Sequence, residues 1–267
     1  MRERQPLRIR DMPQAVIGKI SGELILARTK IEIIDPNNSI ASAQESLNEN
    51  PLIHVFGHTP DDYKVWAKFE RELASLKQVG ALVAWQYYDL RRGVKGLFMG
   101  SVLRAWEKGL GVTIIPTVQD YDRGHYPNAD ALNFQSTKAT LKHLDKPGHI
   151  LAVAPTGHRD ISELSKAVEG IGALLTRVDP NTSILTTAII PSSIKKGVAT
   201  KVYVGKLLSP QDLEEKRAQI FGNAQTEGES KLEIKHKNNQ QVADVVMLEI
   251  ANLLPEQYRG PYRNFVV

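Results

Sequence analysis

The 267-residue chain contains no cysteine. Disulfides, thiolate metal sites and a cysteine nucleophile are therefore excluded, and any chemistry must use oxygen or nitrogen atoms. The chain also lacks a run of the roughly 20 apolar residues that a membrane-spanning helix needs. Even the apolar segment 15–27 is interrupted by Lys19 and Glu23. Residues 1–10 are basic but lead into no apolar core of the signal-peptide type. We therefore expect a cytoplasmic protein that does not cross a membrane.

Neither sign of charge dominates the chain. There are 34 lysine and arginine residues against 30 aspartate and glutamate residues, which gives a formal net charge of +4. This small excess permits attraction to anionic lipid or nucleic acid, but it is also ordinary for a soluble enzyme. No compact basic run with interleaved aromatic residues is present, so we expect no nucleic-acid partner. Because 42% of the residues are hydrophobic, the chain can bury a full core, and we expect one domain over residues 1–267.

The segment 13–27 has the pattern of an amphipathic helix. Its apolar residues recur at roughly helical spacing, and four arginines precede it within residues 1–10. These apolar residues are Val16, Ile17, Ile20, Leu24 and Ile25. Such a helix can anchor a protein on a membrane surface. The same pattern also fits a helix that packs on its own domain, so both interpretations stay open.

Short β-rich runs alternate with helical segments along most of the chain. The predicted strands span residues 30–34, 52–56, 81–85, 112–115, 150–154, 184–190 and 200–204. One predicted helix begins at residue 60, and the others span 97–106, 129–144, 161–175, 210–220 and 242–254. Polar stretches at 38–50 and 223–239 are predicted to be connections. This alternation indicates a single α/β domain with a largely parallel, mixed sheet flanked by helices and a C-terminal helical part at 210–262.

A histidine follows one of these strands at the position where α/β sheets bind ligands. His58 lies in the loop after the strand 52–56, and Asp62 lies in the first turn of the helix that Pro60 begins. One helical turn can bring this carboxylate back to the imidazole. The carboxylate would then hold one ring nitrogen and leave the other to accept a proton from a hydroxyl. The alternative is an ordinary helix start, in which Thr59 is the cap and acidic residues complement the helix dipole.

The sequence around this histidine resembles a known family. Residues 51–62, Pro-Leu-Ile-His-Val-Phe-Gly-His-Thr-Pro-Asp-Asp, are similar to the first block of the 1-acylglycerol-3-phosphate acyltransferases, in the glycerophospholipid acyltransferase family. In that block a strand delivers a histidine, and an aspartate follows after four intervening residues. Here three residues separate His58 from Asp62. The resemblance implies that His58 is the catalytic base and that Asp62 orients it.

Residues 148–159 resemble the third block of the same family, where a strand ends in Pro-Glu-Gly-Thr-Arg. Pro155, Gly157 and Arg159 match this pattern, whereas Thr156 stands at the glutamate position and His158 at the threonine position. The resemblance implies that this segment binds substrate and that its arginine binds the phosphate of the acceptor. From the residues alone, the alternative is a surface arginine paired with a nearby acid.

Two further blocks follow the family order. Residues 110–117 occupy the place of the second block, and Arg123 is the nearest residue to its phosphate-binding arginine. Residues 184–191 resemble the fourth block, a hydrophobic strand that ends in a proline, here Pro191, and lines the acyl pocket. Residues 254–262 are similar to the closing segment of many bacterial members. The resemblance thus extends in order along most of the chain, which no single short motif would supply.

This resemblance implies an enzyme of phospholipid biosynthesis. It would transfer a fatty acyl group from acyl-CoA or acyl carrier protein to the hydroxyl of a lysophospholipid or glycerol-phosphate-type acceptor. The resemblance implies no metal or other cofactor, and peripheral association with the cytoplasmic membrane. The altered first and third blocks leave a second interpretation, in which the fold is catalytically degenerate and binds lipid or a partner protein.

Two other histidines could be mistaken for the catalytic one. His125 and Asp130 have the family spacing, but they lie in a turn-rich stretch beyond the second block. We interpret this match as a coincidence. His54 lies within the strand 52–56 and is predicted to be a core or wall residue.

Overall fold

The computed structural model describes residues 30–57, 62–89, 93–156, 162–190, 199–222 and 229–265, together with residues 16, 20, 23, 24 and 27. For residues 62–64, 85, 88 and 93–99 it describes the backbone only. Among the described residues, no helix is both long enough and apolar enough to cross a membrane.

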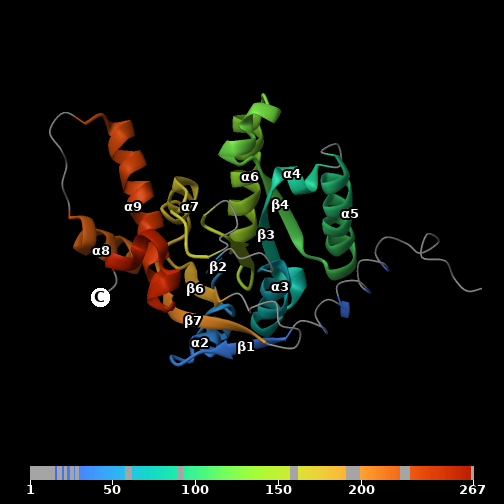
Figure 1. Cartoon of the computed structure of the whole chain (residues 1–267), viewed down its shortest axis with the longest axis horizontal. Helices are drawn as coiled ribbons and strands as arrows, with labels where there is room; N and C mark the ends of the chain where they lie inside the picture. The colour runs from blue at the N-terminus through green and yellow to red at the C-terminus, as the bar shows by residue number, and fades with distance from the viewer. Residues whose placement is uncertain are drawn as a thin grey trace, which may run out of the picture.

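Within the described residues, seven strands form one sheet in the order β1-β7-β6-β2-β5-β3-β4 (Figure 1). The strands are β1 (Ile31–Ile34), β2 (Leu52–Phe56), β3 (Val79–Ala84), β4 (Thr113–Thr117), β5 (Ile150–Val153), β6 (Ser183–Ile190) and β7 (Thr200–Leu208). Neighbouring strands are parallel except β6 and β7, which form an antiparallel pair. The predicted α/β architecture with a largely parallel, mixed sheet is therefore confirmed.

Helices cover both faces of this sheet. One face packs against α2 (Ser39–Ser46), α3 (Asp62–Leu73) and α5 (Gly93–Leu110). The other face packs against α6 (Ala129–Leu144), α7 (Glu169–Leu175), α8 (Pro210–Phe221) and α9 (Lys231–Asn252). Shorter elements complete the fold: α4 (Trp85–Tyr88), η2 (Leu76–Gln78), η3 (Asp120–His125), η4 (Glu256–Tyr258) and η5 (Gly260–Phe265).

Strand β2 is central in the sheet, and all five of its residues are buried. Ile53 and Val55 belong to the core under α6, α7 and α9, whereas Leu52 and Phe56 belong to the core under α2, α3 and α5. A strand buried on both faces is a nearly continuous apolar run in the sequence. For this reason the sequence predicted the bounds of β2 correctly.

Both polar stretches that were predicted to be connections contain helices. In 38–50, the helix α2 begins because the carboxylate of Asp35 accepts the backbone N–H groups of Ser39 and Ile40, each at 2.8 Å. In 223–239, α9 begins at Lys231, where Ser230 and Glu233 form a reciprocal capping box. Such side chains satisfy the free N–H groups of a first helical turn. The prediction of connections was therefore wrong in both stretches, because polar residues cap helix starts there.

The helix predicted at 161–175 is shorter than expected. Helix α7 begins at Glu169, and residues 162–168 are irregular. The backbone N–H of Leu164 donates to the carbonyl oxygen of Tyr258 (2.9 Å), and that of Ala167 donates to the hydroxyl of Tyr262 (3.0 Å). Partners from the C-terminal segment thus replace the intrahelical bonds that a helix would have made.

A buried polar network connects β2 with α3 and β6. Nδ1 of His54 is hydrogen-bonded to Oε1 of Glu70 on α3, and Nε2 of His54 lies 2.8 Å from the hydroxyl of Thr187 on β6. The exposed fractions of His54, Glu70 and Thr187 are 1%, 0% and 0%. His54 is therefore a core residue, as predicted, and both of its ring nitrogens have partners.

Replacement of Glu70 by alanine is expected to destabilise the fold by about 3 kcal/mol or more, because the imidazole is left buried without its acceptor. Equilibrium unfolding in urea measures this loss. The control is Glu72→Ala, since Glu72 is an exposed residue of the same helix and its loss is expected to cost less than about 0.5 kcal/mol. Equal losses in the two variants would contradict the stabilising role of the network.

Candidate functional site

The carboxyl ends of the parallel strands meet at one edge of the sheet. Strand β2 lies between β5 and β6, with Val55 opposite Val153 and Phe56 opposite Thr187. The bonding to β6 continues one residue further, because the N–H of Gly57 donates to the carbonyl oxygen of Thr187 (3.1 Å). The segments that follow β2 and β5 therefore leave the sheet side by side. These segments are the ones that resemble the first and third blocks.

The connections from this edge go to different faces of the sheet. Strand β2 is followed by α3, and β3 is followed by α4 and α5. Helices α3 and α5 pack on the same face of the sheet. Strand β5, which lies between β2 and β3, is followed by α7 on the opposite face. In open α/β sheets such a change of face leaves a crevice beyond the carboxyl ends of the strands, and ligands bind there. The topology thus identifies the end of β5 as the centre of the candidate site.

Most of the predicted site residues lie where side chains are not described. His58, Gly157, Arg159 and Pro191 are outside the described residues. Asp62 is the first residue of α3, and the structure describes its backbone only. That His58, Asp62 and Arg159 face one cleft therefore stays a prediction. The structure describes three of the predicted site residues in full: Pro155, Thr156 and Arg123.

A cavity of about 760 Å³ opens beyond β3, β4 and β5 at this edge. Helix α6 forms one wall, and α7 and α9 form the opposite wall (Figure 1). Thr156 and Arg123 both line this cavity. Two residues that the resemblance implied as substrate-binding are thus brought to one site by the strand order. Among the described residues, no group of three or more His, Asp or Glu side chains could hold a metal ion.

The segment after β5 is firmly held at the base of the cavity. Thr156 is completely buried. Pro155 is buried as well, and its carbonyl oxygen accepts the N–H of Val168 (2.9 Å). This bond closes the connection between β5 and α7. Of these two residues, Thr156 belongs to the cavity lining and Pro155 does not.

Arg123 lies on the rim of the cavity, and carboxylates already bind its guanidinium. Its Nε lies 2.9 Å from Asp120, and one terminal nitrogen lies 2.6 Å from Asp130. These hydrogen bonds, with Asp130 the stronger influence, raise the pKa of Arg123. Because Asp130 is bound to Arg123, and Nδ1 of His125 lies 3.2 Å from Asp122 instead, His125 and Asp130 form no pair with each other. The matching spacing of those two residues has no counterpart in their contacts.

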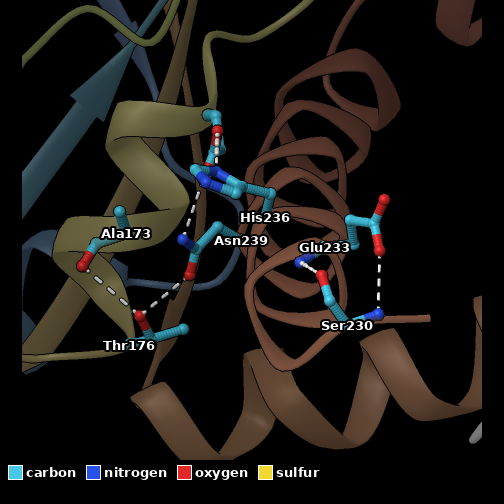
Figure 2. Close-up of polar contacts among 7 residues, drawn as sticks. Ala173, Thr176, Ser230, Glu233, His236 and Asn239 are labelled. Carbon is cyan, nitrogen blue, oxygen red and sulfur yellow. Dashed lines mark hydrogen bonds and ion pairs between the residues drawn. The ribbon is translucent and has the colours of Figure 1, made fainter. Parts of the chain in front are cut away.

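The α7–α9 wall carries a histidine that a carboxylate orients (Figure 2). Nδ1 of His236 lies 2.7 and 2.9 Å from the two carboxylate oxygens of Glu169. The amide of Asn239 donates to the same carboxylate at 2.9 Å. All three residues line the cavity. A hydrogen bond that holds one ring nitrogen sets the orientation of the imidazole and leaves Nε2 for a ligand.

Sequence reasoning missed this group. Glu169 and His236 are 67 positions apart and belong to no motif. The spacing of His236 and Asn239 on one helix face is the one local signal, and it is too common to indicate a site. In addition, His236 lies in the stretch 223–239 that was predicted to be a connection.

Close contact between α7 and α9 keeps this wall together. A Cβ atom on Gly172 would lie 1.8 Å from the carbonyl oxygen of Asn239, so only glycine fits. Nearby, the hydroxyl of Thr176 lies 3.3 Å from the carbonyl oxygen of Ala173 and 3.4 Å from Oδ1 of Asn239 (Figure 2). The contact therefore fixes the position of Asn239 relative to α7.

Comparison of the chain with models of known protein families finds no match, and comparison with curated proteins finds no significant similarity.

Gly172→Ala is expected to destabilise the protein by about 2 kcal/mol or more, because α7 and α9 must separate to admit a methyl group. Gly170→Ala is the matched control on the same helix, since a Cβ there meets nothing within 4 Å. That control is expected to be neutral or stabilising by up to about 1 kcal/mol. Thermal and urea unfolding of both variants provide the comparison, and similar stabilities would exclude the proposed close packing.

Proposed function

We propose that this chain is an acyltransferase, which moves a fatty acyl group from an acyl thioester to the hydroxyl of a lysophospholipid or glycerol-phosphate-type acceptor. The observation that carries the proposal is the position of β2 between β5 and β6. This order gathers the segments that resemble three family blocks at one edge of the sheet. A cavity large enough for a small molecule opens beside one of them, the segment at the end of β5.

In the proposed reaction, His58 removes the proton from the acceptor hydroxyl while Asp62 holds the other nitrogen of the ring. The resulting oxygen attacks the thioester carbonyl and forms a tetrahedral oxyanion. Backbone N–H groups near Gly57 or at the start of α3 are suited to stabilise this charge. The oxyanion then collapses, the C–S bond breaks, and the leaving thiolate takes the proton from the imidazolium.

Substrate binding is assigned to the segments after β5 and β6. Arg159 would bind the acceptor phosphate through its guanidinium fork, which matches a phosphate better than a lysine does. Gly157, with Thr156 and Pro155, would shape the same loop, and Pro191 would border the acyl chain. The donor is acyl-CoA or acyl carrier protein.

The N-terminal segment supports a location at the membrane surface. Val16, Ile20 and Leu24 are helical and are 42%, 46% and 51% exposed. Residues four apart share one face of a helix, so these side chains form an apolar stripe open to solvent. Glu23 meanwhile forms an ion pair with Arg71 of α3 (2.7 Å). The exposed side chains are those that the anchor interpretation requires, and the ion pair shows that the segment also contacts α3.

Purified protein incubated with radiolabelled acyl-CoA and lysophosphatidic acid is expected to form phosphatidic acid. His58→Ala is expected to reduce the rate by about 100-fold or more, because a positioned base contributes roughly that factor. His125→Ala is the control, since His125 is an exposed histidine outside the proposed mechanism, and full activity is expected. Equal activity in His58→Ala and the wild type would remove His58 from the mechanism. Product from neither would favour the alternative function, a degenerate fold that binds lipid or a partner protein.

Binding to vesicles of phosphatidylcholine and phosphatidylglycerol is expected to require the apolar stripe. Serine at positions 16, 20 and 24 is expected to weaken binding by about tenfold or more, because each buried apolar side chain contributes about 1.5 kcal/mol or more. Phe134→Ser is the control, as Phe134 is 72% exposed on α6. Sedimentation with vesicles gives the bound fraction, and unchanged binding in the triple variant would contradict the anchor.

A further inference from the structure

The wall of the cavity formed by α6 can accept hydrogen bonds but has few donors left. The hydroxyl of Ser136 donates to main-chain carbonyl oxygens of Pro116 and Leu132, and that of Thr137 donates to Asn133 (2.9 Å). The amide of Asn133 is also occupied, because it bonds to both the N–H and the carbonyl of Val118. Hydroxyl oxygens keep lone pairs after donating. This wall therefore suits a ligand that presents hydroxyl donors.

The opposite wall has the reverse character. Arg177, two residues after α7, and Lys235 of α9 line the cavity, and neither forms an ion pair with a described residue. The carboxylate of Glu169 pairs with neither of these cations, because it is bound to His236 and Asn239. Nε2 of His236 forms no hydrogen bond with a described residue. This wall therefore suits the anionic part of a ligand.

We infer that the cavity binds the head group of the acceptor, and that it accepts a phosphorylated polyol ring in addition to the glycerol phosphate unit. The inference rests on the proposed function, in which this edge of the sheet binds an acceptor. Ring hydroxyls donate to Ser136 and Thr137, and a phosphate on the ring, distinct from the glycerol phosphate assigned to Arg159, binds Arg177 and Lys235. Paired cations from two elements are well suited to a phosphate.

The size of the cavity supports this class of ligand. The volume of about 760 Å³ lies within the roughly 300–1,000 Å³ of sites that enclose whole small molecules, and so leaves room for a ring beyond a glycerol unit. Apolar side chains, among them Leu82, Ile171 and Leu174, also line the cavity and can pack against the carbon atoms of such a ring.

Soluble probes test the inference on the full chain by isothermal titration calorimetry. Glucose 6-phosphate, which has both a polyol ring and a phosphate, is expected to bind at least tenfold more tightly than glucose or inorganic phosphate. The double variant Arg177→Gln and Lys235→Gln is expected to bind both glucose 6-phosphate and inorganic phosphate about tenfold more weakly than the wild type. Thr137→Val is expected to bind glucose 6-phosphate about threefold more weakly and to bind inorganic phosphate as tightly as the wild type does.

Lys237→Gln is the control for general electrostatic attraction. Lys237 lies on the same helix but is paired with Glu229 (3.2 Å), so its loss is expected to leave binding unchanged. Equal weakening in Lys237→Gln and in the double variant would overturn the assignment to this cavity. Equal affinity for glucose 6-phosphate, glucose and inorganic phosphate would overturn the ligand class. Thermal unfolding of each variant checks that it is folded.

The inference and the proposed function fail in different ways. If the protein acylates lysophosphatidic acid but glucose 6-phosphate neither binds nor inhibits, the head-group assignment is wrong and the acyltransferase stands. If glucose 6-phosphate binds as expected but no acyl transfer occurs to any lysophospholipid, the cavity assignment stands and the reaction is wrong.

Discussion

The pairing of β2 with both β5 and β6 is the constraint on which the rest of the structure depends. The three segments that resemble family blocks belong to these strands, and a slip of the register by one residue would move every side chain of a strand to the other face. The apolar residues of β2 hold this register, since they are buried in both cores. His54 adds directional bonds to α3 and β6. Those bonds join the strand before the His58 loop to the helix after it.

A second packing constraint determines the shape of the cavity. Helices α7 and α9 meet where Gly172 lies against the backbone of Asn239, and this contact places the side chains of Glu169, His236 and Asn239 on one wall. Across from them, the side chains of α6 are bound to the backbone of β4 and of the loop after it. The cavity therefore lies between α6, whose hydroxyls donate to the main chain, and the α7–α9 wall, which carries Glu169, His236 and Asn239.

These two constraints join at the end of β5. On one side its neighbour β2 leads to α3, which lies on the opposite face of the sheet. On the other side lies the cavity, with Thr156 at its base. The change of face at β5 therefore places the crevice beyond the carboxyl ends of the strands, where ligands bind in open α/β sheets.

The sequence by itself determined the α/β class, the bounds of the buried strand β2 and the interior position of His54. These depend on local patterns, since a strand covered on both faces is apolar throughout. It also indicated that His58, Thr156 and Arg159 follow strands, where ligands bind. Only the tertiary structure decided that β5 lies between β2 and β3, and that Arg123 is bound to Asp120 and Asp130. The start of α9 and the contact of His236 with Glu169 were also tertiary outcomes. The physical reason is that strand order and contacts between distant segments arise from packing of the whole chain, which no local spacing encodes.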